Sequence, residues 1–261
     1  MIRLAIAGAL GRTGRRVTEL ALGDARFRVV AALTSPHDRQ IGEVVHGGDS
    51  SVTVTDSIPA DCDVLIDFSL PEGTMAWLDW CQIRGTPMII GVTGHSASQR
   101  ERMDRAAAKI AVLHASNFSL GIAVLRGILG GLTKRLGEAY DVEIVETHHR
   151  RKADAPSGTA LTLRDEIARA RGRAGEETTV YGREGRVGER PVGQIGVHAV
   201  RMGDVVGRHE VHFSGPGETI TFTHEAHSRD AFASGALRAA AWILGKPAGS
   251  YSLRDIVEAE P

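Results

Sequence analysis

Several residue types are scarce in this sequence, and each shortage excludes a class of protein. Its 261 residues include only two cysteines, Cys62 and Cys81, which form no CxxC motif, so we expect two free thiols in a reducing compartment. No apolar run approaches the roughly 18 residues that a membrane-spanning helix needs. The 31 Lys and Arg residues nearly balance the 32 Asp and Glu residues, so the net charge is −1. A net charge this small gives no overall electrostatic attraction to nucleic acid or anionic membranes. The start is strand-like rather than a signal peptide, so we expect a cytoplasmic protein without nucleic-acid or membrane partners.

Lysine is also scarce, because four lysines and 27 arginines make up the 31 basic residues. A lysine in a motif-like setting, such as Lys152, is therefore a candidate functional group. The remaining composition, with 42% hydrophobic and 24% charged residues, is typical of a folded protein with one large or two modest domains.

The first part of the chain alternates short, continuously apolar segments with helical patterns. Apolar runs without polar alternation are typical of parallel strands that are covered on both faces. We therefore expect an α/β fold that opens with a doubly wound parallel sheet, a Rossmann domain for a dinucleotide, over residues 1–118. The expected strands are 4–7, 29–33, 64–68, 88–91 and 111–113, and the clearest helices are 12–22 and 71–84.

The pattern changes after residue 119. Helical patterns now flank strands in which apolar and polar residues alternate, which indicates a sheet with only one face in a core. We expect a C-terminal α+β domain with a mixed sheet over residues 119–229, for substrate binding and oligomerisation, and a tail, 230–261, whose helix returns to the first domain. The expected elements are helices 122–136 and 157–171, a mobile loop 172–193, and strands 142–146, 195–202, 205–213 and 219–224.

A glycine-rich segment, Gly8-Ala9-Leu10-Gly11-Arg12-Thr13-Gly14, separates the first strand from the first helix. Glycines at such a turn let a pyrophosphate approach the backbone and the helix N-terminus. The spacing is GxxGxxG rather than the common GxGxxG, and a purely structural turn is the alternative. Its place between strand and helix favours a dinucleotide site.

The end of the second strand bears on the choice of cofactor. An acid commonly stands there to bind the ribose hydroxyl of NADH, but this chain has Thr34 and Ser35, and no carboxylate precedes Asp38. Cations lie nearby at Arg12, His37 and Arg39. This pattern favours NADPH over NADH.

The richest segment runs from Glu146 to Leu161 and contains five consecutive residues that can carry positive charge, His148 to Lys152. Ser157 is a good N-cap for the following helix, whose first amides at Gly158 and Thr159 would be free to bind an anion. Together these groups would bind a dianion. A solvated basic loop is one alternative, and a metal site at the paired histidines is another, although crowded cations would repel a metal ion.

The string ETHHRRKADAPSGTAL strongly resembles the signature of the dihydrodipicolinate reductase family, and GALGRTG resembles its cofactor loop. Residues 66–69, 71–73, 91–94, 116–119 and 196–201 also resemble family segments, in order over nearly the whole chain. The resemblance implies a homotetramer that reduces hydroxy-tetrahydrodipicolinate, a small dicarboxylate, with NADPH or NADH. No metal is implied.

The resemblance also implies roles for individual residues. His148 would be the catalytic acid/base and Lys152 the second catalytic donor, while His149, Ser157, Gly158 and Thr159 would bind substrate carboxylate. Cofactor contacts would come from Gly8, Ala9, Leu10, Gly11, Arg12, Thr13, Thr34, Ser35, Phe68, Gly91, Val92, Thr93, Ala115, Ser116, Asn117 and Phe118. Val92 and the Thr34-Ser35 pair depart from the family pattern.

Two other functions remain open at this stage. A dehydrogenase of the same architecture that acts on aspartate would keep the glycine loop without needing the dianion site. A redox sensor that binds NADP(H) without turnover would be expected to have lost part of the His-Lys cluster, which is complete here. We expect the late histidines to be structural or at the surface, namely His198, His209, His212, His224 and His227. Asp67 is either functional or a helix cap.

Overall fold

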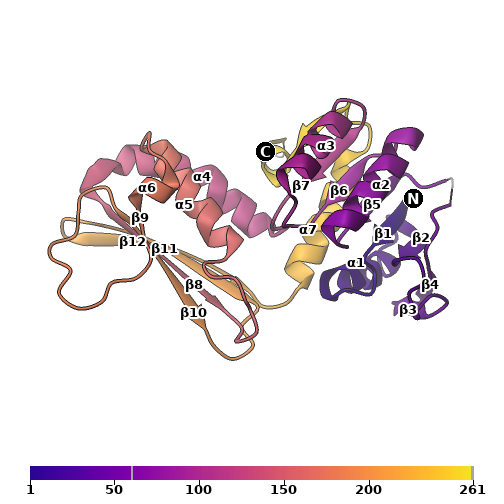
Figure 1. Ribbon diagram of the computed structural model, residues 1–261, viewed down its shortest axis with the longest axis horizontal. Helices are drawn as coiled ribbons and strands as arrows, with labels where there is room; N and C mark the ends of the chain where they lie inside the picture. Colours follow the sequence, from indigo (N-terminus) through magenta and orange to yellow (C-terminus); the bar gives the residue numbers. More distant parts are fainter. Residues whose placement is uncertain (60, 260–261) are drawn as a thin grey trace. The chain divides into compact units, whose positions relative to one another are not determined.

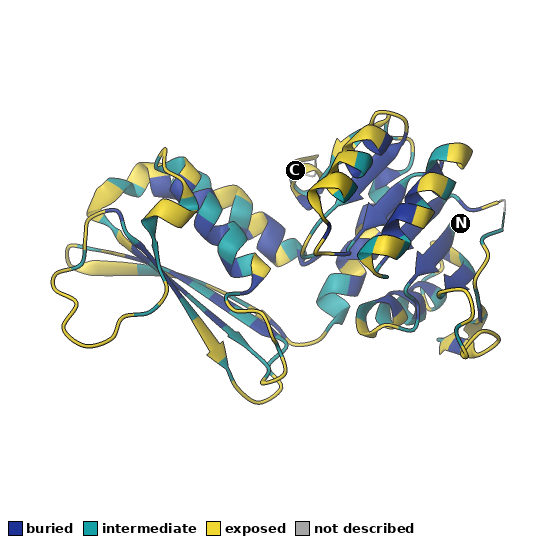
Figure 2. Ribbon diagram, in the orientation of Figure 1, coloured by how far each residue is buried: buried dark blue, intermediate teal, exposed yellow. Residues whose placement is uncertain are grey.

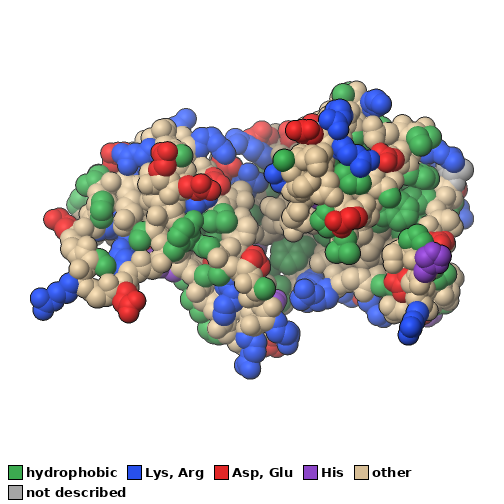
Figure 3. Space-filling model, in the orientation of Figure 1, with side chains coloured by type: hydrophobic (Ala, Val, Ile, Leu, Met, Phe, Trp, Pro, Cys, Tyr) green, Lys and Arg blue, Asp and Glu red, His purple; other side chains and the backbone are tan. Residues whose placement is uncertain are grey.

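The computed structural model describes residues 1–59 and 61–259 and divides the chain into two compact units. The first unit combines Met1–Leu120 with the chain from Arg229 onward, and the second is Gly121–Ser228 (Figure 1). No helix in the described part of the chain is long and apolar enough to cross a bilayer. On the face that Figure 3 shows, acidic and basic side chains are interspersed, in keeping with the balanced charge of the sequence.

The first unit is built on an eight-stranded sheet with the order β13-β7-β6-β5-β1-β2-β4-β3. Its strands are parallel except for the β3–β4 hairpin. The strands are β1 (Ile2–Ala7), β2 (Phe27–Leu33), β3 (Val44–Gly47), β4 (Ser50–Thr55), β5 (Val64–Asp67), β6 (Met88–Ile90), β7 (Ala111–His114) and β13 (Gly249–Tyr251). The helices are α1 (Arg12–Leu22), α2 (Pro71–Arg84), α3 (Ala97–Ala107), α7 (Asp230–Ile243) and α8 (Leu253–Ala259).

Both faces of this sheet are buried, which is why its strands are apolar without alternation. Leu65 packs with Leu78 of α2 and Met103 of α3 on one face. On the other face Ile66 is fully buried, and α1 and α7 pack against each other and the strands (Figures 1 and 2). The expected doubly wound architecture is confirmed.

The second unit has a five-stranded mixed sheet with the order β12-β11-β8-β10-β9. Strands β9 and β10 run parallel to β8. Strand β11 pairs antiparallel with both of its neighbours, β8 and β12. The elements are α4 (Leu120–Leu136), the 3₁₀ turn η1 (Gly137–Ala139), β8 (Asp141–His148), α5 (Gly158–Ala170), α6 (Gly175–Thr178), β9 (Thr179–Val180), β10 (Ile195–Arg201), β11 (Gly207–Gly215) and β12 (Glu218–Ala226).

Helices α4 and α5 cover one face of this sheet. Leu129 and Leu163 pack there against Ile144 and Phe213, and Figure 1 shows both helices over the same side. Residues that point to the opposite face, such as Thr221, remain exposed. The expected mixed sheet with one buried face is confirmed.

Two local expectations differ from the structure. The segment 172–193 is not an unstructured loop throughout, because α6 and β9 lie within it, and β9 pairs with the start of β10. Long-range bonds hold this segment, since the buried guanidinium of Arg164 donates to Thr179 Oγ1 (3.5 Å) and Tyr181 OH (3.0 Å). The β3–β4 hairpin was not expected from the sequence, because its strands are short and largely polar.

Candidate active site

The glycine loop needs two of its glycines for steric reasons. Gly8 has φ +71°, and a Cβ there would lie 2.4 Å from the carbonyl oxygen of Phe68. A Cβ at Gly14 would lie 2.1 Å from the carbonyl oxygen of Gly8. Helix α1 begins directly after Gly11, which supplies no side-chain cap. No side chain of the N-cap residue therefore covers the first amides of α1. Amides in this position commonly bind the phosphates of a nucleotide.

The other predicted cofactor residues follow the carboxyl ends of β5, β6 and β7, which meet at the same edge of the parallel sheet as the glycine loop. A Cβ added to Gly91 would lie 2.2 Å from Cε1 of the Phe68 ring. The Phe68 ring also packs edge-on against the Phe118 ring, with ring centroids 5.5 Å apart. Gly91 must therefore be glycine for the Phe68 ring to lie there. Val92 beside it is buried.

Asp67 at the end of β5 is fully buried, and burial raises the pKa of its carboxyl. Its Oδ1 accepts from the amide of Ser69 (2.8 Å), while the N-cap of α2 is Leu70. Asp67 therefore shapes the turn after β5 and does not cap the helix.

In the structure, the carboxylate of Asp38 lies close to the end of β2. Thr34 Oγ1 donates to Asp38 Oδ2 at 2.6 Å, and this hydrogen bond lowers the pKa of Asp38. Ser35 is exposed beside them. Asp38 is thus hydrogen-bonded to the residue that directly follows β2, the part of the chain where NADH-binding proteins commonly have an acid.

In the second unit, the centre of the predicted site is a carboxylate that the sequence reading left without a role. Glu146 in β8 is completely buried. It accepts hydrogen bonds from His148 Nδ1 (2.5 Å), from the backbone amide of Ser157 (2.9 Å), and from both Nη atoms of Arg201 (2.9 and 2.8 Å). Three separate segments, the end of β8, the start of α5 and the end of β10, therefore converge on one side chain.

These donors keep Glu146 ionised. Burial alone raises the pKa of Glu146, but the hydrogen bonds from His148, Arg201 and the Ser157 amide outweigh it and hold the pKa at about 2. An ionised carboxylate only accepts hydrogen bonds. His148 must therefore carry a proton on Nδ1, which leaves Nε2 as the ring atom available to a substrate.

Ser157 is the N-cap of α5, as the sequence predicts. Its Oγ accepts from the amide of Ala160 (3.2 Å) and lies 3.1 Å from His209 Nε2. A Cβ added at Gly158 would meet no atom within 4 Å, so the start of the helix has open space beside it. A ligand carboxylate could approach the first turn there.

Lys152 and His148 lie in the same neighbourhood. The charge of each lowers the pKa of His209, and the rings of His148 and His209 are 5.2 Å apart. Lys152 Nζ is paired with both carboxylate oxygens of Asp154 at 2.8 Å. His149 follows the strand end, and its carbonyl accepts from the amide of Lys152 (3.1 Å). His148 and Lys152 thus both lie near His209, which contacts the Ser157 N-cap at the start of α5.

The histidines of the late strands differ in their surroundings. His209 contacts the N-cap serine and packs edge-to-face against His148, while His198 on the opposite face pairs with Glu143 Oε2 (2.6 Å). Burial, followed by the charges of His148 and His224, lowers the pKa of His209 to about 3. His209 is thus a neutral, buried histidine at neutral pH.

This burial makes a prediction about stability. The unfolded pKa of a histidine is about 6.5, so the contribution of neutral His209 is fully present above that pH and is lost as pH falls toward 3. Between pH 7 and pH 5 we expect a loss of about 2 kcal/mol from this residue. His209→Gln should flatten that decline in urea unfolding at the two pH values, whereas His212→Gln, on the opposite face of β11, should not. An equal decline in wild type and His209→Gln would contradict the assignment.

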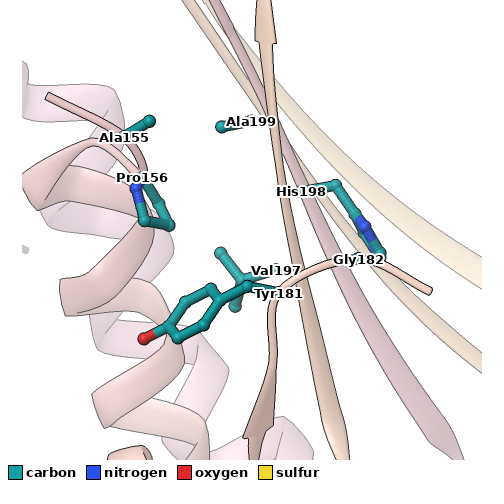
Figure 4. A pocket seen from close by; sticks show the side chains of 7 residues that line it. All are labelled: Ala155, Pro156, Tyr181, Gly182, Val197, His198 and Ala199. Atoms are coloured by element: carbon teal, nitrogen blue, oxygen red, sulfur yellow. The ribbon is translucent and has the colours of Figure 1, made fainter. Parts of the chain in front are cut away.

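The described ranges contain no group of three His, Cys, Asp or Glu residues that could hold a metal ion. A separate pocket of about 700 Å³ lies along β10 and is lined by Ala155, Pro156, Tyr181, Gly182, Val197, His198 and Ala199 (Figure 4). None of the predicted site residues lines it.

Sequence reasoning missed Glu146 and Arg201 as site residues. A signal was present, because Val142, Ile144 and Glu146 alternate onto the buried face of β8. A buried carboxylate needs hydrogen-bond donors around it. His148 at the end of the same strand and Arg201 at the end of β10 could supply them.

Comparisons with known proteins cover both units. The family model described as "Dihydrodipicolinate reductase, N-terminus" matches residues 2–118, and "Dihydrodipicolinate reductase, C-terminus" matches residues 121–257. Relatives named 4-hydroxy-tetrahydrodipicolinate reductase from Thiobacillus denitrificans and Halorhodospira halophila are 44% and 43% identical to the chain. The alignments cover 98% and 97% of this chain and 98% of each relative.

Among solved structures, a dipicolinate-bound dihydrodipicolinate reductase from Paenisporosarcina sp. TG-14 has a TM-score of 0.75 at 24% identity, covering 98% of this chain and 99% of that one. The DAP dehydrogenase of C. glutamicum, in complex with DAP, has a TM-score of 0.55 at 15% identity, covering 97% and 93%. At these identities the likeness shows a shared fold.

Proposed function

Because the chain belongs to the dihydrodipicolinate reductase family, we propose that it reduces 4-hydroxy-tetrahydrodipicolinate to tetrahydrodipicolinate with a reduced nicotinamide nucleotide. The reaction belongs to the diaminopimelate and lysine pathway. The observation that carries the proposal is the convergence of His148 and the Ser157-capped helix start on the buried carboxylate of Glu146, with Lys152 near the adjoining His209.

The first unit offers the features that a nicotinamide nucleotide needs. The space that Gly8 and Gly14 leave, and the open start of α1, suit a pyrophosphate held by residues 8–13. Phe68, Gly91–Thr93 and Ala115–Phe118 would line the nicotinamide. The bound nucleotide supplies the hydride.

The second unit would hold the substrate by its two carboxylates. The amides of Gly158 and Thr159 at the start of α5 would bind one, and His149 and Lys152 the other. On substrate binding, a substrate carboxylate would replace Asp154 as the ionic partner of Lys152. The substrate would then be oriented by two anion sites, which reduces the entropy cost of reaction.

His148 and Lys152 would then carry the chemistry of the protein. The substrate loses one water, and a hydride and a proton then add to the dehydrated ring. The product therefore holds two more hydrogens than the dehydrated ring. With both ring nitrogens protonated, His148 would donate the proton from Nε2 and keep the Nδ1 proton in its hydrogen bond to Glu146. Lys152 would stabilise negative charge that develops on the ring.

For the cofactor, we propose NADPH as the preferred donor, supported by Arg12 at the start of α1 and by His37 and Arg39, which follow β2 in the sequence. Asp38 opposes this preference, because its carboxylate would repel a ribose phosphate. Wild-type kcat/KM should be higher with NADPH than with NADH, and Asp38→Asn should raise the NADPH:NADH ratio by about tenfold, the effect of about 1.4 kcal/mol. Asp49→Asn, an exposed acid in the β3–β4 turn, is the control. A strong wild-type preference for NADH would overturn the proposal.

We also propose a cytoplasmic homotetramer. The sheet face opposite α4 and α5 remains exposed at Thr219, Thr221 and Thr223, and such an alternating face suits sheet-to-sheet assembly. Light scattering should give four times the chain mass of 27.9 kDa. A monomer would remove this part of the proposal.

The substrate is tested by the oxidation of reduced nucleotide. Freshly prepared 4-hydroxy-tetrahydrodipicolinate should be reduced rapidly, whereas aspartate with NAD⁺ or NADP⁺ and simple keto acids with ammonia and the reduced nucleotides should be turned over far more slowly. Rapid turnover of aspartate would favour the alternative of an aspartate dehydrogenase. Nucleotide binding without turnover of any substrate would favour a redox sensor.

A further inference from the structure

We propose that Glu146 is the positioning residue of the site: it fixes His148 in the Nδ1–H tautomer and ties it to the carboxylate-binding start of α5. This inference rests on the proposed function for its catalytic meaning. Its structural content, the tautomer of one ring, can be measured without any turnover.

The first argument is the set of hydrogen bonds. Glu146 has two oxygens and no proton, and every neighbour that contacts them is a donor. Oε2 receives His148 Nδ1 and Arg201 Nη1, and Oε1 receives the Ser157 amide and Arg201 Nη2. The neutral His148 ring has one proton to place, and only Nδ1–H satisfies this carboxylate.

The second argument concerns the other ring nitrogen. His148 Nε2 lies over Gly207 of β11, where an added Cβ would come within 3.0 Å of it. The absence of a side chain at Gly207 leaves that edge of the ring uncovered by β11. The His148 side chain keeps 12% of its surface exposed, so the ring is held from the interior and presents Nε2 outward.

The third argument is electrostatic. The groups that face His148 are Glu146 on its own strand, Arg201 of β10, His209 of β11 with His224 of β12 behind it, and Lys152 in the following loop. Glu146 is the only anion of this set, and the carboxylate of Asp154 is bonded to Lys152. Without Glu146, a protonated His148 would be surrounded by cations and neutral rings.

Arg201 completes the arrangement. Its guanidinium reaches the carbonyl of Asp154 (2.6 Å) as well as Glu146, so one ion pair joins the β10 end, the loop of Lys152 and the start of α5. Glu146 thus holds together the proton donor and the helix start that binds the substrate carboxylate. Loss of its charge should affect the proton transfer more than substrate binding, because a glutamine still offers an acceptor to the Ser157 amide.

The test compares Glu146→Gln with Glu143→Gln. Glu143 lies three residues earlier on β8, faces the opposite side, and bonds a histidine, His198, at a similar distance (2.6 Å). Long-range ¹H–¹⁵N correlation of the imidazoles at about pH 9, where ordinary histidines are neutral, reports which ring nitrogen carries the proton. We expect Nδ1–H for His148 in wild type and in Glu143→Gln, and a shift toward Nε2–H in Glu146→Gln.

Kinetics give the second readout. Glu146→Gln should lower kcat by about 10²-fold, the lower end of what a positioned acid contributes, with a smaller change in KM. Glu143→Gln should keep kcat near wild type. An unchanged Nδ1–H tautomer together with wild-type kcat in Glu146→Gln would overturn the inference.

Two further outcomes are decisive as well. If Glu146→Gln does not fold, the wild-type ring alone decides, since a proton on Nε2 of His148 contradicts the inference and a proton on Nδ1 supports it. If wild type fails to reduce the substrate, the proposed function fails, while the tautomer comparison still tests the role of Glu146.

Discussion

Replacing His148 by glutamine should lower kcat by about 10²–10⁴-fold, the contribution of a positioned general acid. Glutamine keeps a polar group of similar reach but cannot transfer a proton. Binding of the reduced nucleotide should stay near normal, because the proposed nucleotide site is formed by the first unit, and KM should change much less than kcat.

His198→Gln is the matched control for this variant. His198 is also a histidine paired to a strand glutamate, Glu143, but it lies outside the predicted site. It should keep wild-type kcat. Near-wild-type turnover in His148→Gln would remove His148 from the mechanism, and an equal loss in both variants would indicate general damage to the sheet.

Replacing Lys152 by methionine should have a comparably large effect. The substitution preserves most of the length and apolar surface of the side chain and removes only the charge. We expect kcat/KM to fall by about 10³-fold, which is equivalent to about 4 kcal/mol of lost transition-state stabilisation. Both kcat and KM should worsen, because Lys152 is proposed to bind a carboxylate and to stabilise charge on the ring.

Lys134→Met provides the comparison, since Lys134 is an exposed lysine on α4. Steady-state kinetics and nucleotide titration of both variants measure the effect. If Lys152→Met kept wild-type kcat/KM, the observed Lys152–Asp154 ion pair would be a surface contact, and the charge stabilisation would have to come from another group.

The sequence predicted the elements well where local signals were strong. Helix α1 at Arg12–Leu22 and helix α2 at Pro71–Arg84 begin and end as expected, because a glycine turn precedes one and a proline opens the other. The β3–β4 hairpin was missed, since its strands are short and polar and carry no apolar periodicity. The segment 175–180 was missed because its order depends on long-range bonds to Arg164.

The candidate site shows the same division between local and long-range information. His148, Lys152 and Ser157 lie in one stretch of sequence, so their motif could be identified directly. Arg201 is 55 residues from Glu146, and only the pairing of β10 beside β8 brings the two together. Asp38 reaches Thr34 through a turn whose geometry no motif specifies.

A single turnover with isotopically labelled cofactor tests the central claim most directly. Reduced nucleotide that carries deuterium at the transferable position is mixed with fresh 4-hydroxy-tetrahydrodipicolinate and wild-type protein, and the product is analysed by mass spectrometry. The account predicts tetrahydrodipicolinate with one deuterium for each nucleotide oxidised. A product without deuterium, or substrate that remains while the nucleotide stays reduced, would contradict it.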